Sequence, residues 1–287
     1  MRVLVTGGNA GIGYFTAEQL ASAGAEVVIG SRDPAKAETA ATAIRSQVVG
    51  ARVTHVRLDL ADLASLEAVD PGELDAVVCN AGVMLDAPPR RETGSGHELM
   101  FGTNHLGHFA LVARLMPRLA PAARIVTTGS FAAKSARLDF ADLQSERDYH
   151  PKRAYERSKL AQMLFAFELD RRLREAGSKR LSVVAHPGGA LDSLTPSRPP
   201  VHVRTTGQWL RGVPARVLLQ GKDAGARPAV RAVLGPDVAG GQLWGPSVFG
   251  LRGRPRLEER WTNLADDAAA GRLWAESVTL TGLDPLG

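Results

Sequence analysis

Short runs of β-branched and other apolar residues alternate with longer segments of helical pattern along the whole chain. This rhythm is typical of repeated βαβ units, which build a parallel sheet covered by helices on both faces. The 287 residues suit one large domain. We therefore predict a single α/β domain over residues 1–287, with a Rossmann-type, doubly wound parallel sheet of about seven strands. The expected strands are Val3–Val5, Val27–Ile29, Val53–Leu58, Ala76–Cys79, Arg124–Thr128, Leu181–Ala185 and Gln242–Trp244.

Small or turn-forming residues follow the first six runs, where a parallel strand meets its loop. In an open doubly wound sheet, ligands bind outside the carboxyl ends of the strands. We therefore expect residues far apart in the sequence to share one crevice. The six loops are Thr6-Gly7-Gly8, Gly30-Ser31, Asp59, Asn80-Ala81-Gly82, Gly129-Ser130 and Pro187-Gly188-Gly189.

The first of these loops is rich in glycine and leads directly into a helical pattern that begins at Tyr14. Glycines at such a junction allow a sharp turn, a close approach of the backbone to a pyrophosphate, and tight packing of the helix on the strand. The sequence therefore predicts a dinucleotide-binding turn that contains Gly7, Gly11, Ile12 and Gly13.

The end of the second strand indicates which dinucleotide binds. An acidic residue there would bind the ribose hydroxyls of NAD(H), whereas an arginine would bind the 2′-phosphate of NADP(H). Ser31 and Arg32 follow this strand, and a guanidinium can hold a phosphate through two hydrogen bonds. Asp33 precedes Pro34, as a helix N-cap would. We therefore expect NADP(H) in preference to NAD(H).

Asp59 and Leu60 close the third strand and could contact the adenine ring. A cap for the following segment is an alternative role for Asp59.

Tyr155 and Lys159 stand one helical turn apart near the start of a helical pattern that runs to about Ala176. A free tyrosine titrates near pH 10, and a neighbouring ammonium stabilises its phenolate. Tyr155 is therefore a candidate general acid and base. Ser130 ends the fifth strand and could hold a substrate oxygen in the same crevice. Asn104 lies within the helical pattern Glu98 to Arg118, either as an ordinary polar position or as a group that passes protons onward from Lys159.

Taken together, these motifs resemble the short-chain dehydrogenase/reductase family over almost the whole chain. The resemblance implies a catalytic tetrad of Asn104, Ser130, Tyr155 and Lys159, with Lys159 also bonding the nicotinamide ribose. It further implies that the cofactor lies along Asn80, Ala81, Gly82, Pro187 and Gly188.

Two segments, Phe101 to Phe109 and Ala154 to Leu173, look like the retinol-dehydrogenase-like branch. That branch acts on varied, often lipophilic alcohols and carbonyls, usually with NADP(H). The implied function is an NADP(H)-dependent ketoreductase or alcohol dehydrogenase with a small, lipophilic substrate.

The chain departs from the family pattern at two places. The family commonly has a threonine at the position of Asp192, where it contacts the nicotinamide carboxamide. In addition, Tyr155 follows Ser130 at a spacing of 25 positions, which adds a loop near the helices that usually form a dimer. A homo-oligomer therefore stays an open alternative.

Two other functions use the same fold. A nucleotide-sugar epimerase or dehydratase would also use a tyrosine and a lysine at this spacing, but its glycines usually follow G-x-x-G-x-x-G rather than the G-x-x-x-G-x-G of Gly7, Gly11 and Gly13. A non-catalytic NADP(H)-sensing protein is the third alternative. The intact Ser130, Tyr155 and Lys159 argue against it.

The segment 191–222 breaks the βα rhythm and holds four prolines between Pro196 and Pro214. We predict that it forms a lid over the substrate, with Trp209 and Leu210 contributing to an apolar pocket wall. A disordered surface insertion is the alternative.

The net charge of +5 and the sequence pI near 9.7 raise the question of an acidic partner. The arginines are scattered, so we expect neither a nucleic-acid nor a membrane-surface partner.

The single cysteine, Cys79, excludes an intrachain disulfide and a cysteine-based zinc site. The histidines lack a matching carboxylate set, so we expect no metal site. Since no apolar stretch is long enough for a membrane span, we expect a cytoplasmic protein.

Overall fold

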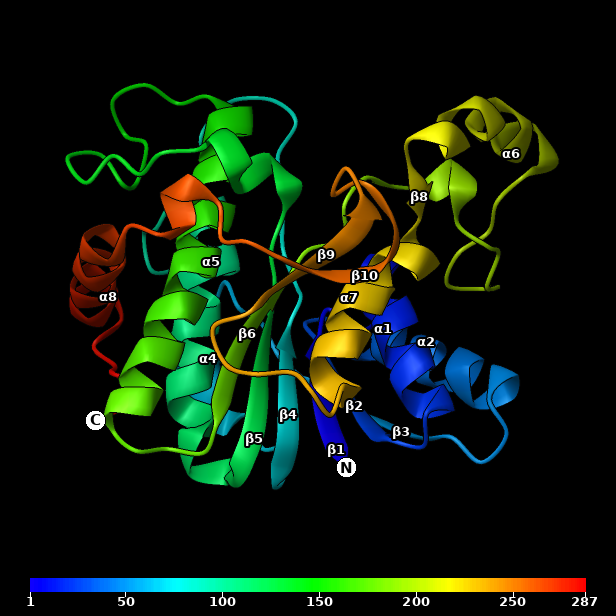
Figure 1. The fold of residues 1–287 in the computed structure, drawn as a ribbon, viewed down its shortest axis with the longest axis horizontal. Coiled ribbons are helices and arrows are strands. Elements are labelled where there is room, and N and C mark those ends of the chain that lie inside the picture. Colours follow the sequence, from blue (N-terminus) through cyan, green and yellow to red (C-terminus); the bar gives the residue numbers. More distant parts are fainter.

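The computed structural model describes all 287 residues and centres on an eight-stranded sheet in the order β10-β9-β6-β5-β4-β1-β2-β3 (Figure 1). Strands β1 to β6 and β9 run parallel, and β10 pairs antiparallel with β9 at one edge. The strands of this sheet are β1 (Arg2–Thr6), β2 (Glu26–Ser31), β3 (Arg52–Arg57), β4 (Leu74–Cys79), β5 (Leu119–Thr128), β6 (Leu181–Ala185), β9 (Leu243–Val248) and β10 (Arg252–Glu258).

Helices cover both faces of this sheet, as the βαβ rhythm predicts. Helices α1, α2 and α7 lie on one face, and α4, α5 and α8 lie on the other (Figure 1). The α-helices are α1 (Gly11–Ser22), α2 (Pro34–Gln47), α3 (Leu99–Phe101), α4 (Gly107–Leu115), α5 (Pro151–Glu175), α6 (Thr206–Gly212), α7 (Lys222–Leu234) and α8 (Asp267–Thr281). The doubly wound α/β fold is confirmed.

Strand β1 shows why its sequence is a continuous apolar run. Successive side chains of a strand point to opposite faces, so Val3 and Val5 join the core under α1, α2 and α7, whereas Leu4 joins the core under α4 and α5. All three residues are fully buried. A strand covered on both faces needs apolar residues at consecutive positions.

Each of the seven predicted runs overlaps a strand of this sheet, with Leu58 and Gln242 just outside β3 and β9, but the prediction of about seven strands misses β10. The strand has the sequence RGRPRLE, with exposed positions and a bulge between Arg252 and Pro255. Proline and charged residues are tolerated there because an edge strand pairs on one side only.

The segment predicted as one helix from Glu98 to Arg118 is not continuous. Helix α3 passes into a π-helical segment, Gly102–Leu106, before α4 begins at Gly107. The close approach of Gly107 to the β3–β4 connection permits this path, since a Cβ atom there would lie 2.3 Å from the Leu60 carbonyl oxygen. Asn104 lies in the middle of the π-helical segment.

The predicted lid, 191–222, has more regular structure than its sequence indicates. Its two ends pair as a small parallel sheet of β7 (Ala190–Leu191) and β8 (Gln220–Gly221). Helix α6 between them begins with a capping box formed by Thr205 and Gln208. Figure 1 shows α6 standing apart from the central sheet, on the side of α1 and α2.

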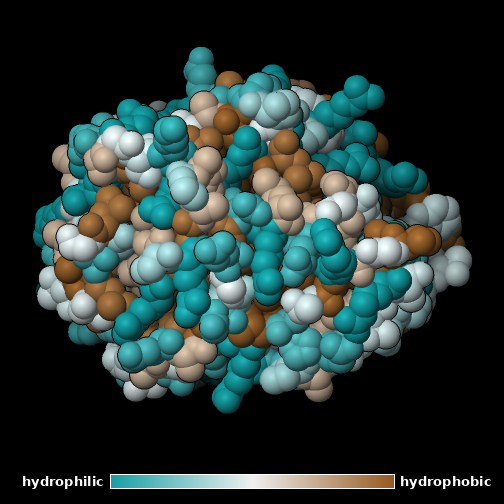
Figure 2. Space-filling view, turned by 90° about the horizontal axis from the view of Figure 1, so that it is seen from below, coloured by the Kyte–Doolittle hydropathy of each residue, from teal (hydrophilic) through white to brown (hydrophobic).

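No helix of the structure combines the length and the apolar character that a membrane crossing requires. Hydrophilic and hydrophobic residues are interspersed on the face shown in Figure 2, and no large apolar patch gathers there.

Candidate active site

A cleft of about 740 Å³ lies at the carboxyl ends of the parallel strands. It lies where β1 has β2 on one side and β4 on the other, which is the point of chain reversal at which doubly wound sheets bind ligands. Most predicted site residues line it: Gly7, Gly11, Ile12, Gly13, Ser31, Arg32, Asp59, Leu60, Asn80, Ala81, Gly82, Ser130, Tyr155, Lys159 and Pro187. Asn104 and Gly188 do not.

The glycine turn has the geometry that a bound pyrophosphate requires. Gly7 and Gly11 adopt left-handed conformations, with φ of 65° and 58°. A Cβ atom on Gly13 would lie 2.3 Å from the Gly7 carbonyl oxygen, so only glycine fits there. Ala10 precedes α1 and provides no side-chain cap, which leaves N–H groups of the first turn free for a ligand.

The loop after β4 is fastened to the end of β1 by Thr6. The Thr6 hydroxyl accepts hydrogen bonds from the backbone N–H groups of Asn80 and Ala81, both at 2.9 Å. The Asn80 side chain returns a hydrogen bond to the Thr6 carbonyl at 3.0 Å. Asn80 therefore links two strand ends at the floor of the cleft.

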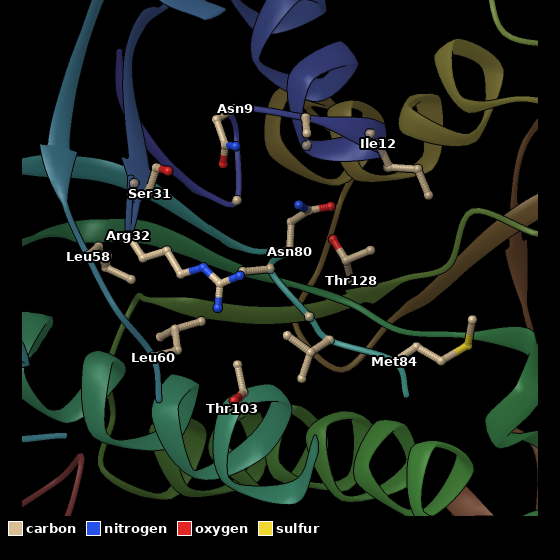
Figure 3. Close-up of a pocket in the computed structure, with 18 of the residues that line it drawn as sticks. Asn9, Ile12, Ser31, Arg32, Leu58, Leu60, Asn80, Met84, Thr103 and Thr128 are labelled. Atoms are coloured by element: carbon tan, nitrogen blue, oxygen red, sulfur yellow. The ribbon is translucent and has the colours of Figure 1, made fainter. Parts of the chain in front are cut away.

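Two cations lie on the cleft wall after β2. The side chain of Arg32 extends into the cleft between Ser31 and Leu60 (Figure 3) and forms no ion pair. Asp33 caps α2 by accepting a hydrogen bond from Lys36 N at 3.1 Å, as predicted. The pKa of Asp33 is lowered chiefly by this backbone hydrogen bond. Lys36, which the sequence reasoning did not single out, lies beside them on the wall.

Asp59 and Leu60 lie on the same wall. The Asp59 carboxylate accepts a hydrogen bond from Ala61 N at 3.0 Å, so it orders its own turn as well as facing the cleft.

The other end of the cleft holds Ser130, Tyr155 and Lys159. Tyr155 and Lys159 lie on α5, and Ser130 follows β5. Burial raises the pKa of Tyr155, and the neighbouring Ser130 side chain opposes that rise. The two side chains therefore stand close together beside the cleft.

Lys159 is 5% exposed, and burial lowers its pKa to about 8. Its ammonium donates to the Thr128 carbonyl at 2.9 Å and to the Gln162 side-chain oxygen at 2.7 Å. The fully buried Gln162 in turn donates to the Cys79 carbonyl at 3.2 Å and lies 3.1 Å from His108 Nδ1. Lys159 thus ends a buried polar network.

Asn104 lies behind the cleft rather than on its wall. Its side-chain oxygen accepts from Val83 N at 2.7 Å, and its amide nitrogen donates to Val83 O at 3.0 Å and to the Ser158 hydroxyl at 2.9 Å. It therefore clamps the loop after β4 to α5. In this arrangement both polar atoms of Asn104 are bonded to protein groups.

Gly188 also has a structural position. Its φ is 67°, and a Cβ atom there would lie 2.5 Å from the Leu251 carbonyl oxygen.

The prediction that Trp209 and Leu210 of the segment 191–222 contribute to an apolar pocket wall is wrong. Trp209 is 37% exposed and Leu210 is 58% exposed, and neither lines the cleft. The short helix that carries them points its apolar residues outward.

The sequence reasoning missed Lys36, Gln162 and Lys222, the first residue of α7. Lys36 could have been found, since it lies three residues after the predicted cap, Asp33, and so faces the same helix end as Arg32. The other two gave no signal, because no motif contains them. The structure brings together no group of three or more His, Cys, Asp or Glu residues that could hold a metal ion.

Comparison with known proteins identifies the family. A family model described as short chain dehydrogenase matches residues 1–142. The chain is also 36% identical to human retinol dehydrogenase 13 over 292 residues, which cover 98% of this chain and 85% of that protein. The chain belongs to the short-chain dehydrogenase family.

Within the short-chain dehydrogenases, it falls in the retinol-dehydrogenase-like branch. Mouse polyprenol dehydrogenase is 35% identical, with 97% of this chain and 83% of that protein covered. Among solved structures, an uncharacterised protein from Mycobacterium paratuberculosis is 37% identical, with a TM-score of 0.80 and coverage of 99% of this chain and 94% of that one. This short-chain dehydrogenase is therefore an oxidoreductase that acts on alcohol or carbonyl groups.

One solved relative carries a cofactor. The structure of RhlG from Pseudomonas aeruginosa, described as an NADP active-site complex, is 27% identical, with a TM-score of 0.61 and coverage of 84% of this chain and 93% of that one.

Proposed function

We propose that this protein is an NADP(H)-dependent dehydrogenase or reductase that uses Tyr155 as acid and base on a lipophilic alcohol or carbonyl compound. The observation that carries the proposal is the distribution of groups along one cleft. Ser130, Tyr155 and Lys159 line one end, and Arg32 and Lys36 line the wall after β2.

The residues present fit a dinucleotide. The uncapped first turn of α1 and the close approach at Gly13 leave a backbone cradle for a pyrophosphate. Arg32 offers two parallel N–H donors without an ion-pair partner of its own, which suits the 2′-phosphate of NADP(H). The NADP complex of the relative RhlG supports the same choice.

In the proposed mechanism, the bound nicotinamide supplies the hydride in reduction and accepts it in oxidation. The Ser130 hydroxyl orients the substrate oxygen, and Tyr155 donates its proton to that oxygen or takes it back. The Lys159 ammonium favours the phenolate of Tyr155 and thereby makes the proton transfer possible near neutral pH.

The names of the relatives support a lipophilic substrate, since they include retinol and polyprenol dehydrogenases. Apolar residues on the cleft wall agree with this class. Val83 and Met84 line it, and Met84 is 59% exposed.

The proposal is tested with a panel of long-chain and cyclic alcohols, aldehydes and ketones, assayed with NADPH, NADP⁺, NADH and NAD⁺ by the absorbance of the reduced nicotinamide. We expect turnover with at least one lipophilic member, and a higher kcat/KM with the phosphorylated cofactor. Binding of NADPH without turnover of any member would contradict the enzymatic proposal.

A further inference from the structure

Lys222 is a cation on the cleft wall that the proposed mechanism does not use. Four cationic side chains line the cleft: Arg32, Lys36, Lys159 and Lys222. The first two follow β2, and Lys159 stands at the catalytic end. Lys222 alone comes from the side of α7, and its side chain is 25% exposed.

The start of α7 is held between α1 and the loop after β6. Helix α7 runs beside α1, the helix that follows the glycine turn (Figure 1), and the Gln19 side chain of α1 donates to the Asp223 carbonyl at 2.7 Å. A Cβ atom on Gly225 would lie 3.2 Å from the Cβ atoms of both Pro187 and Ala190. Lys222 therefore stands beside the Pro187 loop, and it lines the same cleft as Gly11 and Ile12 at the α1 N-terminus.

The backbone of Lys222 is fixed by a buried threonine. Lys222 N donates to the Thr195 hydroxyl at 2.9 Å, and that hydroxyl donates to the Leu191 carbonyl at 2.7 Å. Thr195 is fully buried. The pairing of Leu191 with Gly221 closes the same corner. Lys222 is thus presented from an ordered corner at the base of the segment 191–222.

The Lys222 ammonium is held by one carboxylate. Its Nζ atom lies 2.6 Å from Asp192 Oδ1, and His202 Nδ1 approaches the same oxygen at 3.8 Å. Asp192 stands where the family pattern has threonine, and it does not line the cleft. The pair therefore joins a cation inside the cleft to an anion on the segment 191–222.

We propose that the Lys222 ammonium binds the cofactor pyrophosphate opposite the α1 N-terminus, and that its bond to Asp192 couples the segment 191–222 to the bound cofactor. This inference rests on the proposed function for the identity of the ligand. Pyrophosphate carries two negative charges, and the α1 N–H groups supply only partial positive charge. A full charge on the facing wall completes the site.

The first test measures dissociation constants for NADPH and NADH by fluorescence titration of the wild type, Lys222→Met and Lys222→Arg. Both dinucleotides contain the pyrophosphate, so Lys222→Met should weaken both by a similar factor, about tenfold to a hundredfold for a lost hydrogen bond between charged groups. Lys222→Arg should recover most of the affinity. The matched control is Lys179→Met, which removes an exposed lysine just before β6, at the opposite end of the strands.

The outcomes separate the two proposals. If the wild type binds neither dinucleotide, the proposed function fails. If the wild type binds both and Lys222→Met binds them equally well, or weakens only one of them, the role of Lys222 is refuted and the proposed function stands. Circular dichroism of Lys222→Met guards against a folding defect, and recovery in Lys222→Arg does so independently.

The second test addresses the coupling through limited trypsin digestion at Arg211 and Arg216, which are exposed. In the wild type, we expect saturating NADPH to slow cleavage at these sites severalfold. Asp192→Asn keeps the shape of the side chain but removes the ion pair, so the protection should largely disappear although NADPH still binds. Equal protection in Asp192→Asn would overturn the coupling.

Discussion

Gln162 offers a direct way to adjust the charge of Lys159 without changing any group that lines the cleft. Its side-chain oxygen is 2.7 Å from the Lys159 ammonium, and Gln162 is fully buried. Burial lowers the pKa of Lys159 to about 8. The proposed mechanism requires the charged lysine, so activity should fall as the pH rises through about 8.

Two substitutions of Gln162 should shift, in opposite directions, the pH at which activity falls on the alkaline side of the profile. Gln162→Glu places a carboxylate against the ammonium, and an opposite charge at this range favours the charged form by about 1–3 pH units. Gln162→Met removes a hydrogen bond to a charged group, which contributes about 1.5–3 kcal/mol. The pH at which activity falls should therefore decrease by about 1–2 units.

The assay is kcat/KM as a function of pH, in the reduction direction at saturating NADPH. The wild type should lose activity near pH 8, Gln162→Glu at higher pH and Gln162→Met at lower pH. If all three limbs coincide, Lys159 does not control the profile and the reasoning from its buried network is refuted.

Two further substitutions test the 2′-phosphate and pyrophosphate positions of the dinucleotide site. Arg32→Leu should weaken NADPH binding about tenfold to a hundredfold while the affinity for NADH stays unchanged, as titrations with both would show; an equal loss for both would contradict a contact with the 2′-phosphate. Gly13→Ala places a Cβ atom 2.3 Å from the Gly7 carbonyl and 2.4 Å from the Asn80 amide nitrogen, so it should abolish the binding of both dinucleotides. The matched control is Gly271→Ala in α8, where a Cβ atom would have no neighbouring atom closer than 4.0 Å, and this variant should bind both dinucleotides normally. Unimpaired binding in Gly13→Ala would refute the close approach.

The parallel core of the fold is readable from the sequence because its strands are buried on both faces. A run such as Val3 to Val5 must then be apolar at every position, and each βα junction repeats the same change of pattern. Strand β10 lacks this signal. It lies at the sheet edge, where Arg254 and Pro255 are tolerated, so its sequence resembles a loop.

The candidate site was predictable where a motif carries its residues and not where only the packing does. The glycine turn and the pair of Tyr155 and Lys159 have fixed local spacing, so the sequence locates them. Lys222 reaches the cleft because α7 packs beside α1, more than 200 residues earlier in the chain. The outward orientation of Trp209 likewise depends on how the segment 191–222 folds back, which composition alone does not determine.

The most direct test of the central claim is the reaction of the wild type and of Tyr155→Phe with NADPH that carries deuterium at both C4 positions, followed by mass spectrometry of the alcohol formed from an accepted carbonyl substrate. We predict that the wild type transfers one deuterium to the carbonyl carbon. Tyr155→Phe, with NADPH affinity unchanged, should form the same product at a rate lower by about 10²–10⁴-fold. A wild-type rate in Tyr155→Phe, or a product without deuterium, would contradict the central claim.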